Sequence, residues 1–176
     1  AIDLRINEDS KIFLDKLLQI KLDLNIDKVW IEYTQNLKAK YPVIAEPHKK
    51  ENDRVNYYEI IEKLNQAIKN IDKFTSVSYD AGSAFYVVGQ AIKVTKNQKI
   101  IAPGGFGGMG YALPAAMGAY YGNQSYIPIC ITGDGSFQMN LQELEVIKAN
   151  NIPVKIIVIN NDGYVSIRNT QERFFK

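Results

Sequence analysis

The chain has 176 residues, of which 46% are hydrophobic and 23% charged, and its net charge is +2. These values are ordinary for a globular domain, and the scattered lysines and arginines indicate neither a nucleic-acid nor a membrane partner. No stretch reaches the roughly 18–20 apolar residues of a membrane span, and the first residues lack a signal-peptide pattern, so we expect a cytoplasmic protein. The one cysteine, Cys130, excludes an internal disulfide framework, and its apolar neighbours predict a core position.

Residues 1–55 predict helices followed by a linker. One helix is expected after the capping pair Asp9-Ser10, and a second over residues 26–40, ending before Pro42. The polar segment 42–55 contains two prolines and reads as a linker. His48, the only histidine, lies in that segment, where a solvated linker residue is favoured over a functional base.

A third helix is predicted over residues 57–69, and from Phe74 onward the pattern changes to short β-rich runs that alternate with helices. The predicted strands are 74–79, 99–102, 126–132 and 154–159. The predicted helices are 83–92, 109–121, 138–150 and 165–172. Residues 154–159 are nearly all apolar and β-branched, so we expect a strand buried on both faces. The alternation predicts an α/β fold with a doubly wound, mostly parallel sheet.

Gly-rich joints follow all four predicted strands. They are Asp80-Ala-Gly82, Gly104–Gly110, Gly133-Asp-Gly135 and Asn160-Asn-Asp-Gly163. In an open α/β sheet the carboxyl ends of the strands face one crevice, where ligands bind. The four joints are therefore expected to converge on a single site.

Two of these joints together predict a magnesium site. Asp134 offers a carboxylate on a tight turn, and 24 residues separate Gly135 from the pair Asn160-Asn161. The Asn161 amide and the Gly163 carbonyl add neutral oxygens, and with two phosphate oxygens and water they complete a six-oxygen shell suited to Mg²⁺. The alternative is two unrelated turns.

A rival pattern occupies the second joint. Gly105-Phe-Gly107-Gly-Met-Gly110 matches the G-x-G-x-x-G fingerprint of NAD- or FAD-binding Rossmann domains. Two observations count against that alternative. Asp134 is enclosed by glycines instead of closing a strand, and a dinucleotide site leaves Asn160-Asn161 without a role.

The pattern Gly133-Asp-Gly135, 24 residues and Asn160-Asn161 resembles the signature of thiamine-diphosphate enzymes. Residues 104–116 and 136–144 are similar to the acetolactate-synthase and pyruvate-decarboxylase branch. The resemblance implies that residues 1–55 are the end of a middle domain plus a helical connection and linker. It further implies that residues 56–176 are the cofactor-binding domain, incomplete at its C-terminal end.

The resemblance also implies a role for each site residue. Asp134 and Asn161 would bind Mg²⁺ through their side chains, and Gly163 through its carbonyl. Met109 would support the bend between the two cofactor rings, and the Gly107 carbonyl would accept a hydrogen bond from the 4'-amino group. The remaining implied cofactor contacts are Gly82, Ser83, Gly133, Gly135, Ser136 and Tyr164.

The implied activity is decarboxylation of pyruvate or a related 2-oxo acid, followed by carboligation; a simple decarboxylase is the alternative. Acetolactate synthases usually carry Gln-His where this chain has Ser83-Ala84, and tryptophan where it has Thr170, so the acceptor stays open. The catalytic glutamate is expected in a separate pyrimidine-binding domain, usually of a neighbouring subunit. We therefore expect a homodimer or homotetramer, and no activity from residues 1–176 alone.

Overall fold

The computed structural model describes residues 2–21, 25–44 and 54–175, and the chain divides into two compact units, Ala1–Pro42 and Val43–Lys176. The first unit holds α1 (Ser10–Gln19) and α2 (Lys28–Lys40). The Asp9 carboxylate caps α1 and the Asp27 carboxylate caps α2, each by accepting hydrogen bonds from main-chain N–H groups of the first turn. Both predicted helices are confirmed. His48 lies outside the described residues.

The second unit is built on a four-stranded sheet in which every pairing is parallel. Its strands are β1 (Thr75–Tyr79), β2 (Gln98–Ile101), β3 (Ile127–Gly133) and β4 (Lys155–Ile159). Their order is β2-β1-β3-β4, so the chain adds β2 on one side of β1 and β3 on the other. The predicted α/β fold with a parallel sheet is confirmed.

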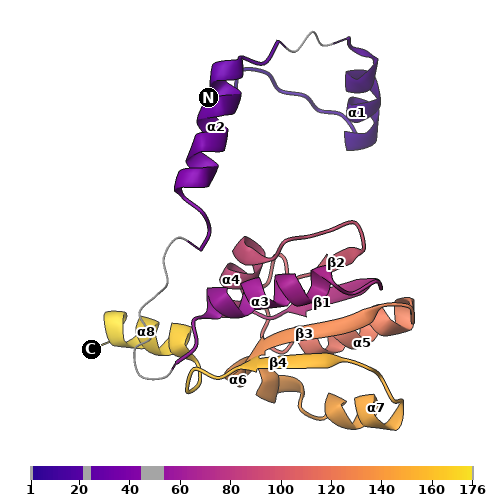
Figure 1. Cartoon of the computed structure of the whole chain (residues 1–176), viewed down its shortest axis with the longest axis vertical. Helices are drawn as coiled ribbons and strands as arrows, with labels where there is room; N and C mark the ends of the chain where they lie inside the picture. The colour runs from indigo at the N-terminus through magenta and orange to yellow at the C-terminus, as the bar shows by residue number, and fades with distance from the viewer. Residues whose placement is uncertain (1, 22–24, 45–53, 176) are drawn as a thin grey trace. The chain divides into compact units, whose positions relative to one another are not determined.

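Helices cover both faces of this sheet, as a doubly wound fold requires. Figure 1 shows α3 and α4 on one face and α5 and α7 on the other. Their bounds are α3 Tyr57–Lys69, α4 Ser83–Ala91, α5 Ala112–Gly122 and α7 Glu143–Ala149. The short α6 (Asp134–Phe137) follows β3, and α8 (Val165–Phe174) follows β4.

The hydrophobic core follows the alternation of side chains along the two central strands. Val77 of β1 and Ile131 of β3 pack in one buried cluster with Ile61 of α3 and Val88 of α4. Cys130 lies in the opposite cluster, against α5. Burial first, and then the charge of a nearby aspartate, raises the pKa of the Cys130 thiol to about 12, so it acts as a core residue, as expected.

Two sequence predictions are wrong. Residues 154–159 are not buried on both faces, because β4 lies at the edge of the described sheet, pairs only with β3, and leaves Lys155 and Val158 exposed. Residues 138–150 do not form one helix: after α6 comes a short 3₁₀ turn at Gln138–Asn140, and then α7. The Asn140 amide donates to the Gly110 carbonyl at 2.6 Å, a tertiary contact that helical periodicity does not reveal.

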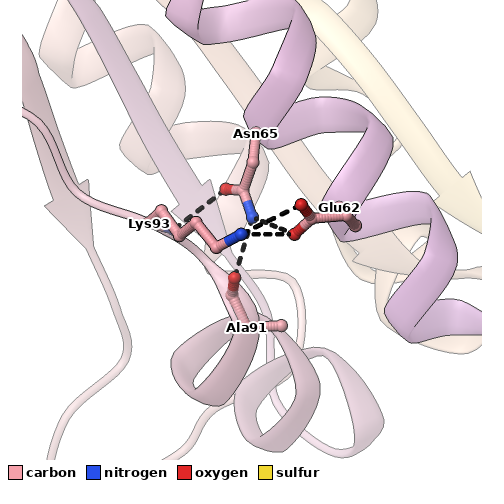
Figure 2. Close-up of polar contacts among 4 residues, drawn as sticks. All are labelled: Glu62, Asn65, Ala91 and Lys93. Carbon is pink, nitrogen blue, oxygen red and sulfur yellow. Dashed lines mark hydrogen bonds and ion pairs between the residues drawn. The ribbon is translucent and has the colours of Figure 1, made fainter. Parts of the chain in front are cut away.

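A polar clamp fastens α3 to the end of α4 (Figure 2). The buried Asn65 side chain donates to the Ala91 carbonyl and accepts from the Lys93 main-chain N–H, both at 2.9 Å. It thereby satisfies two main-chain groups at the C-terminus of α4. The Lys93 ammonium binds both carboxylate oxygens of Glu62 at 2.9 Å. Hydrogen bonds from Lys93, and then from Asn65, hold the pKa of Glu62 below its ordinary value. The Glu62–Lys93 pair therefore stabilises the fold at pH values above the pKa that Glu62 has in the unfolded chain. This stabilisation is lost as the pH falls through the lower pKa of the folded state.

We expect Asn65→Ala to lower the free energy of unfolding by about 2–3 kcal/mol, because it removes two hydrogen bonds and strands a buried carbonyl. Urea denaturation followed by circular dichroism measures the change. Gln66→Ala, one residue along the same helix and exposed, is the matched control and should stay within about 0.5 kcal/mol of the parent. Equal losses in the two variants would show that the clamp contributes nothing specific.

Candidate functional site

The candidate site lies where the winding of the sheet reverses. β1 and β3 are neighbours, but the loop after β1 leads to α4 on one face and the loop after β3 leads through α6 to α7 on the other. Such a switch point opens a crevice at the carboxyl edge of a parallel sheet, where ligands bind. All four Gly-rich joints reach this edge: those after β1, β3 and β4, and the joint after β2 through Met109.

A cavity of about 70 Å³ occupies the crevice. The predicted site residues that line it are Gly82, Ser83, Met109, Gly133, Gly135, Ser136, Asn161 and Tyr164. Asp134 and Gly163 lie beside it, whereas the exposed Gly107 is not among its lining residues. Sites that enclose a whole small ligand measure about 300–1,000 Å³, so this cavity suits only one end of a larger molecule.

A direct hydrogen bond across the crevice joins two of the candidate metal ligands, Asp134 and Gly163. The Gly163 N–H donates to Asp134 Oδ2 at 2.7 Å, and the Gly135 N–H donates to Asp134 Oδ1 at 2.9 Å. Each carboxylate oxygen keeps a free lone pair for a cation. Asn161 Oδ1 is buried and has no hydrogen-bond partner within the described structure. A buried amide oxygen without a donor, close to a carboxylate, matches the chemistry of an oxygen-ligated divalent cation.

The chain after β4 is wound in a way that favours such a site. Asp162, Gly163 and Tyr164 follow one another with φ values of 64°, 79° and 51°. Successive left-handed residues that are not all glycine are uncommon and cost free energy, and they often occur at ligand sites. The Asn160 side chain holds the turn by accepting from the Asp162 N–H at 3.0 Å. This coil brings Asn161 to the cavity and Gly163 to Asp134.

No group of three His, Cys, Asp or Glu side chains that could hold a metal occurs in residues 2–21, 25–44 and 54–175. The candidate ligand set differs from such clusters, because it combines one carboxylate with an amide and a main-chain carbonyl. Its single charge suits a cation whose remaining charge is balanced by an anionic ligand such as a diphosphate.

Asp80, at the end of β1, was not assigned a role from sequence, yet it organises this edge. Its buried carboxylate accepts from the Tyr111 N–H at 2.8 Å and from the Thr132 hydroxyl at 2.6 Å. The first bond fixes the residue that begins α5, and with it the end of the Gly-rich segment that carries Met109. Asp80 is thus a positioning residue, because each of its carboxylate oxygens accepts one of these two hydrogen bonds.

Tyr57, at the start of α3, is the second residue that sequence reasoning missed. It lines the cavity, and its hydroxyl oxygen is buried without a hydrogen-bond partner in the described part of the chain. Burial, and then the charge of Asp80, raises the pKa of the phenol above its ordinary value, so the hydroxyl stays protonated. The helical pattern of 57–69 indicated only a packing role for this aromatic ring.

Comparison with known proteins matches residues 80–176 to the family described as thiamine pyrophosphate enzyme, C-terminal TPP binding domain. The chain belongs to this family, and thiamine pyrophosphate, also called thiamine diphosphate, is its cofactor, with Mg²⁺ as the usual partner. The family resemblance predicted from sequence is confirmed, and the dinucleotide alternative for Gly105–Gly110 is not retained.

Individual relatives point to the same branch. The chain is 35% identical to the acetolactate synthase large subunit of Cyanidium caldarium over 98% of its length, and 35% identical to that of Porphyra purpurea over 83%. It is 32% identical to the chloroplastic acetolactate synthase of Arabidopsis thaliana over 95%. These matches cover only 29%, 23% and 24% of the respective relatives, so the chain spans less than a third of each.

Gly135 is the position where one added carbon tests the cavity most directly. A Cβ there would lie 2.8 Å from Cε1 of Tyr164, so Gly135→Ala must displace that ring from the cavity wall. Because overpacking costs about 1–3 kcal/mol, we expect thiamine diphosphate and Mg²⁺ to bind about tenfold more weakly, as measured by calorimetry on the whole protein. Gly118→Ala, in open space on α5, is the control and should bind normally. Normal binding by the Gly135 variant would contradict a close fit at this wall.

Proposed function

We propose that Asp134, Asn161 and Gly163 hold Mg²⁺ that anchors the diphosphate of thiamine diphosphate, in a protein that decarboxylates pyruvate or a related 2-oxo acid and transfers the resulting acyl unit. The observation that carries the metal part is Asn161 Oδ1, which is buried without a donor, two residues before the Gly163 N–H that binds the Asp134 carboxylate. The family match and the acetolactate synthase relatives support the cofactor and the reaction class.

Each side of the cavity has a distinct task in this proposal. Asp134 supplies the one anionic ligand, while Asn161 and the Gly163 carbonyl complete the protein's share of an oxygen shell. Gly82-Ser83 after β1 and Gly135-Ser136 after β3 border the phosphates, where hydroxyl and main-chain N–H groups can donate. When bound, the cofactor supplies an electron sink for the electrons that departing CO₂ leaves behind.

Carboligation is the favoured outcome, since the relatives are named acetolactate synthases. A simple 2-oxo-acid decarboxylase remains the second candidate because of two departures. Ser83 lines the cavity where that branch usually has glutamine, and the exposed Thr170 of α8 replaces a usual tryptophan. Both departures leave the candidate metal ligands unchanged, so cofactor binding stays possible while the acceptor stays open.

The small cavity also fits a site that another domain completes. We propose that residues 56–176 form the cofactor-binding domain, and that a pyrimidine-binding domain, from a neighbouring subunit of a homodimer or homotetramer, covers the rings and supplies the activating glutamate. Residues 1–176 alone are then inactive. No helix among the described residues is long and apolar enough to cross a membrane. Some relatives are named chloroplastic, and our cytoplasmic assignment stays a prediction.

Removal of the charged ligand tests the metal site. In the whole protein we expect Asp134→Ala to weaken thiamine-diphosphate binding at least about a hundredfold, since even outer-shell partners of a metal contribute 10–100-fold. Calorimetry with and without Mg²⁺ measures it. Asp162→Asn is the matched control: Asp162 lies in the same coil but is exposed and pairs with Arg54, and asparagine tolerates its left-handed φ of 64°. Tight binding without metal, or undiminished binding by the Asp134 variant, would refute the site.

Product analysis tests the reaction class. With pyruvate as substrate, we expect the whole protein to release CO₂ and to accumulate a hydroxyketone in which a new C–C bond joins the acyl carbon to an acceptor. NMR of a reaction with ¹³C-labelled pyruvate identifies the product. A free aldehyde as the sole product would select the decarboxylase, and unchanged pyruvate would exclude it as a substrate.

A further inference from the structure

Tyr57 lines the cavity from an element outside the Gly-rich joints, and its hydroxyl oxygen is buried. α3 precedes β1 and lies along the sheet, with its first residue at the carboxyl edge of the strands (Figure 1). The ring packs against the core cluster on the α3 and α4 side, and the residue borders the cavity together with Ala81 and Asn161. The hydroxyl is therefore held in place by the packing of its own ring.

The hydroxyl has no acceptor in the described structure, although it is buried. Asp80, whose charge contributes to the raised pKa of the phenol, accepts from the Tyr111 N–H and the Thr132 hydroxyl, and it is not a hydrogen-bond partner of Tyr57. Phenylalanine would fill the same space without the penalty of an unpaired buried hydroxyl. A donor in this position calls for an acceptor that enters the cavity.

We propose that the Tyr57 hydroxyl donates a hydrogen bond to a phosphate oxygen of bound thiamine diphosphate. This inference rests on the proposed function, and it adds a cofactor contact from α3 to those from the strand ends. A phosphate is favoured over a ring of the cofactor because the neighbours Ser83 and Asn161 belong to the phosphate and metal end of the proposed site. A neutral donor to an anion also forms a strong hydrogen bond.

The substitution Tyr57→Phe removes one oxygen atom and retains the ring. We expect it to raise the dissociation constants of thiamine diphosphate and of inorganic pyrophosphate, each with Mg²⁺, about tenfold in the whole protein. Tyr58→Phe is the matched control, because the adjacent Tyr58 hydroxyl binds Gln90 Oε1 at 2.6 Å and does not line the cavity. It should leave both constants unchanged.

Calorimetry provides the dissociation constants. As a second measurement, the melting temperature of each variant is compared with and without cofactor. Wild-type binding by Tyr57→Phe, alongside lost binding by Asp134→Ala, would overturn this inference and leave the proposed function standing. Weaker binding of thiamine diphosphate but not of pyrophosphate would overturn the phosphate contact. A parent protein that binds neither ligand would instead overturn the proposed function.

Discussion

The buried carboxylate of Asp80 is the interaction on which the geometry of this edge depends. A charge removed from water is costly unless hydrogen bonds replace its hydration. Here a main-chain N–H of Tyr111 and the hydroxyl of Thr132 do so. The two bonds tie β1 to β3 and to the start of α5, across the point where the connections diverge to opposite faces. The switch point is thus held by a polar contact, while the apolar clusters above and below hold the sheet itself.

Against this fixed edge, the coil after β4 forms a second, separately built wall. Its left-handed residues would be unfavourable alone, and the Gly163–Asp134 hydrogen bond connects them to the end of β3. Gly135 lies so close to the Tyr164 ring that a larger residue at this position would clash with the ring. Steric fit and hydrogen bonding therefore couple the two loops, so that the Asp134 carboxylate lies beside the cavity that Asn161 lines.

Much of the fold and part of the site could be predicted from sequence, because they depend on local patterns. Alternating strands and helices identified the parallel sheet, and turn residues after each strand placed the joints at one edge. Burial of β4 was mispredicted, since an apolar, β-branched strand reads the same at an edge as in the centre. Tyr57 and Asp80 were missed because their roles depend on contacts between distant segments: an aromatic residue at a helix start resembles any core residue, and an acid before Gly82 resembles a turn.

The polar atoms near the cavity bear differently on two properties of the proposed function, cofactor binding and the choice of acceptor. Two residues that line the cavity carry buried polar atoms without a partner in the described structure: Asn161 Oδ1, an acceptor that suits a metal cation, and the Tyr57 hydroxyl, a donor that suits an anion. By contrast, Ser83 lines the cavity and Thr170 lies exposed on α8, and neither is a candidate metal ligand. Under the proposed function, cofactor binding depends on the strand-end geometry of this unit. Acceptor choice would then depend on positions such as Thr170, whose hydroxyl binds the Ser166 carbonyl and, among the described residues, forms no hydrogen bond with Asp134, Asn161 or Gly163.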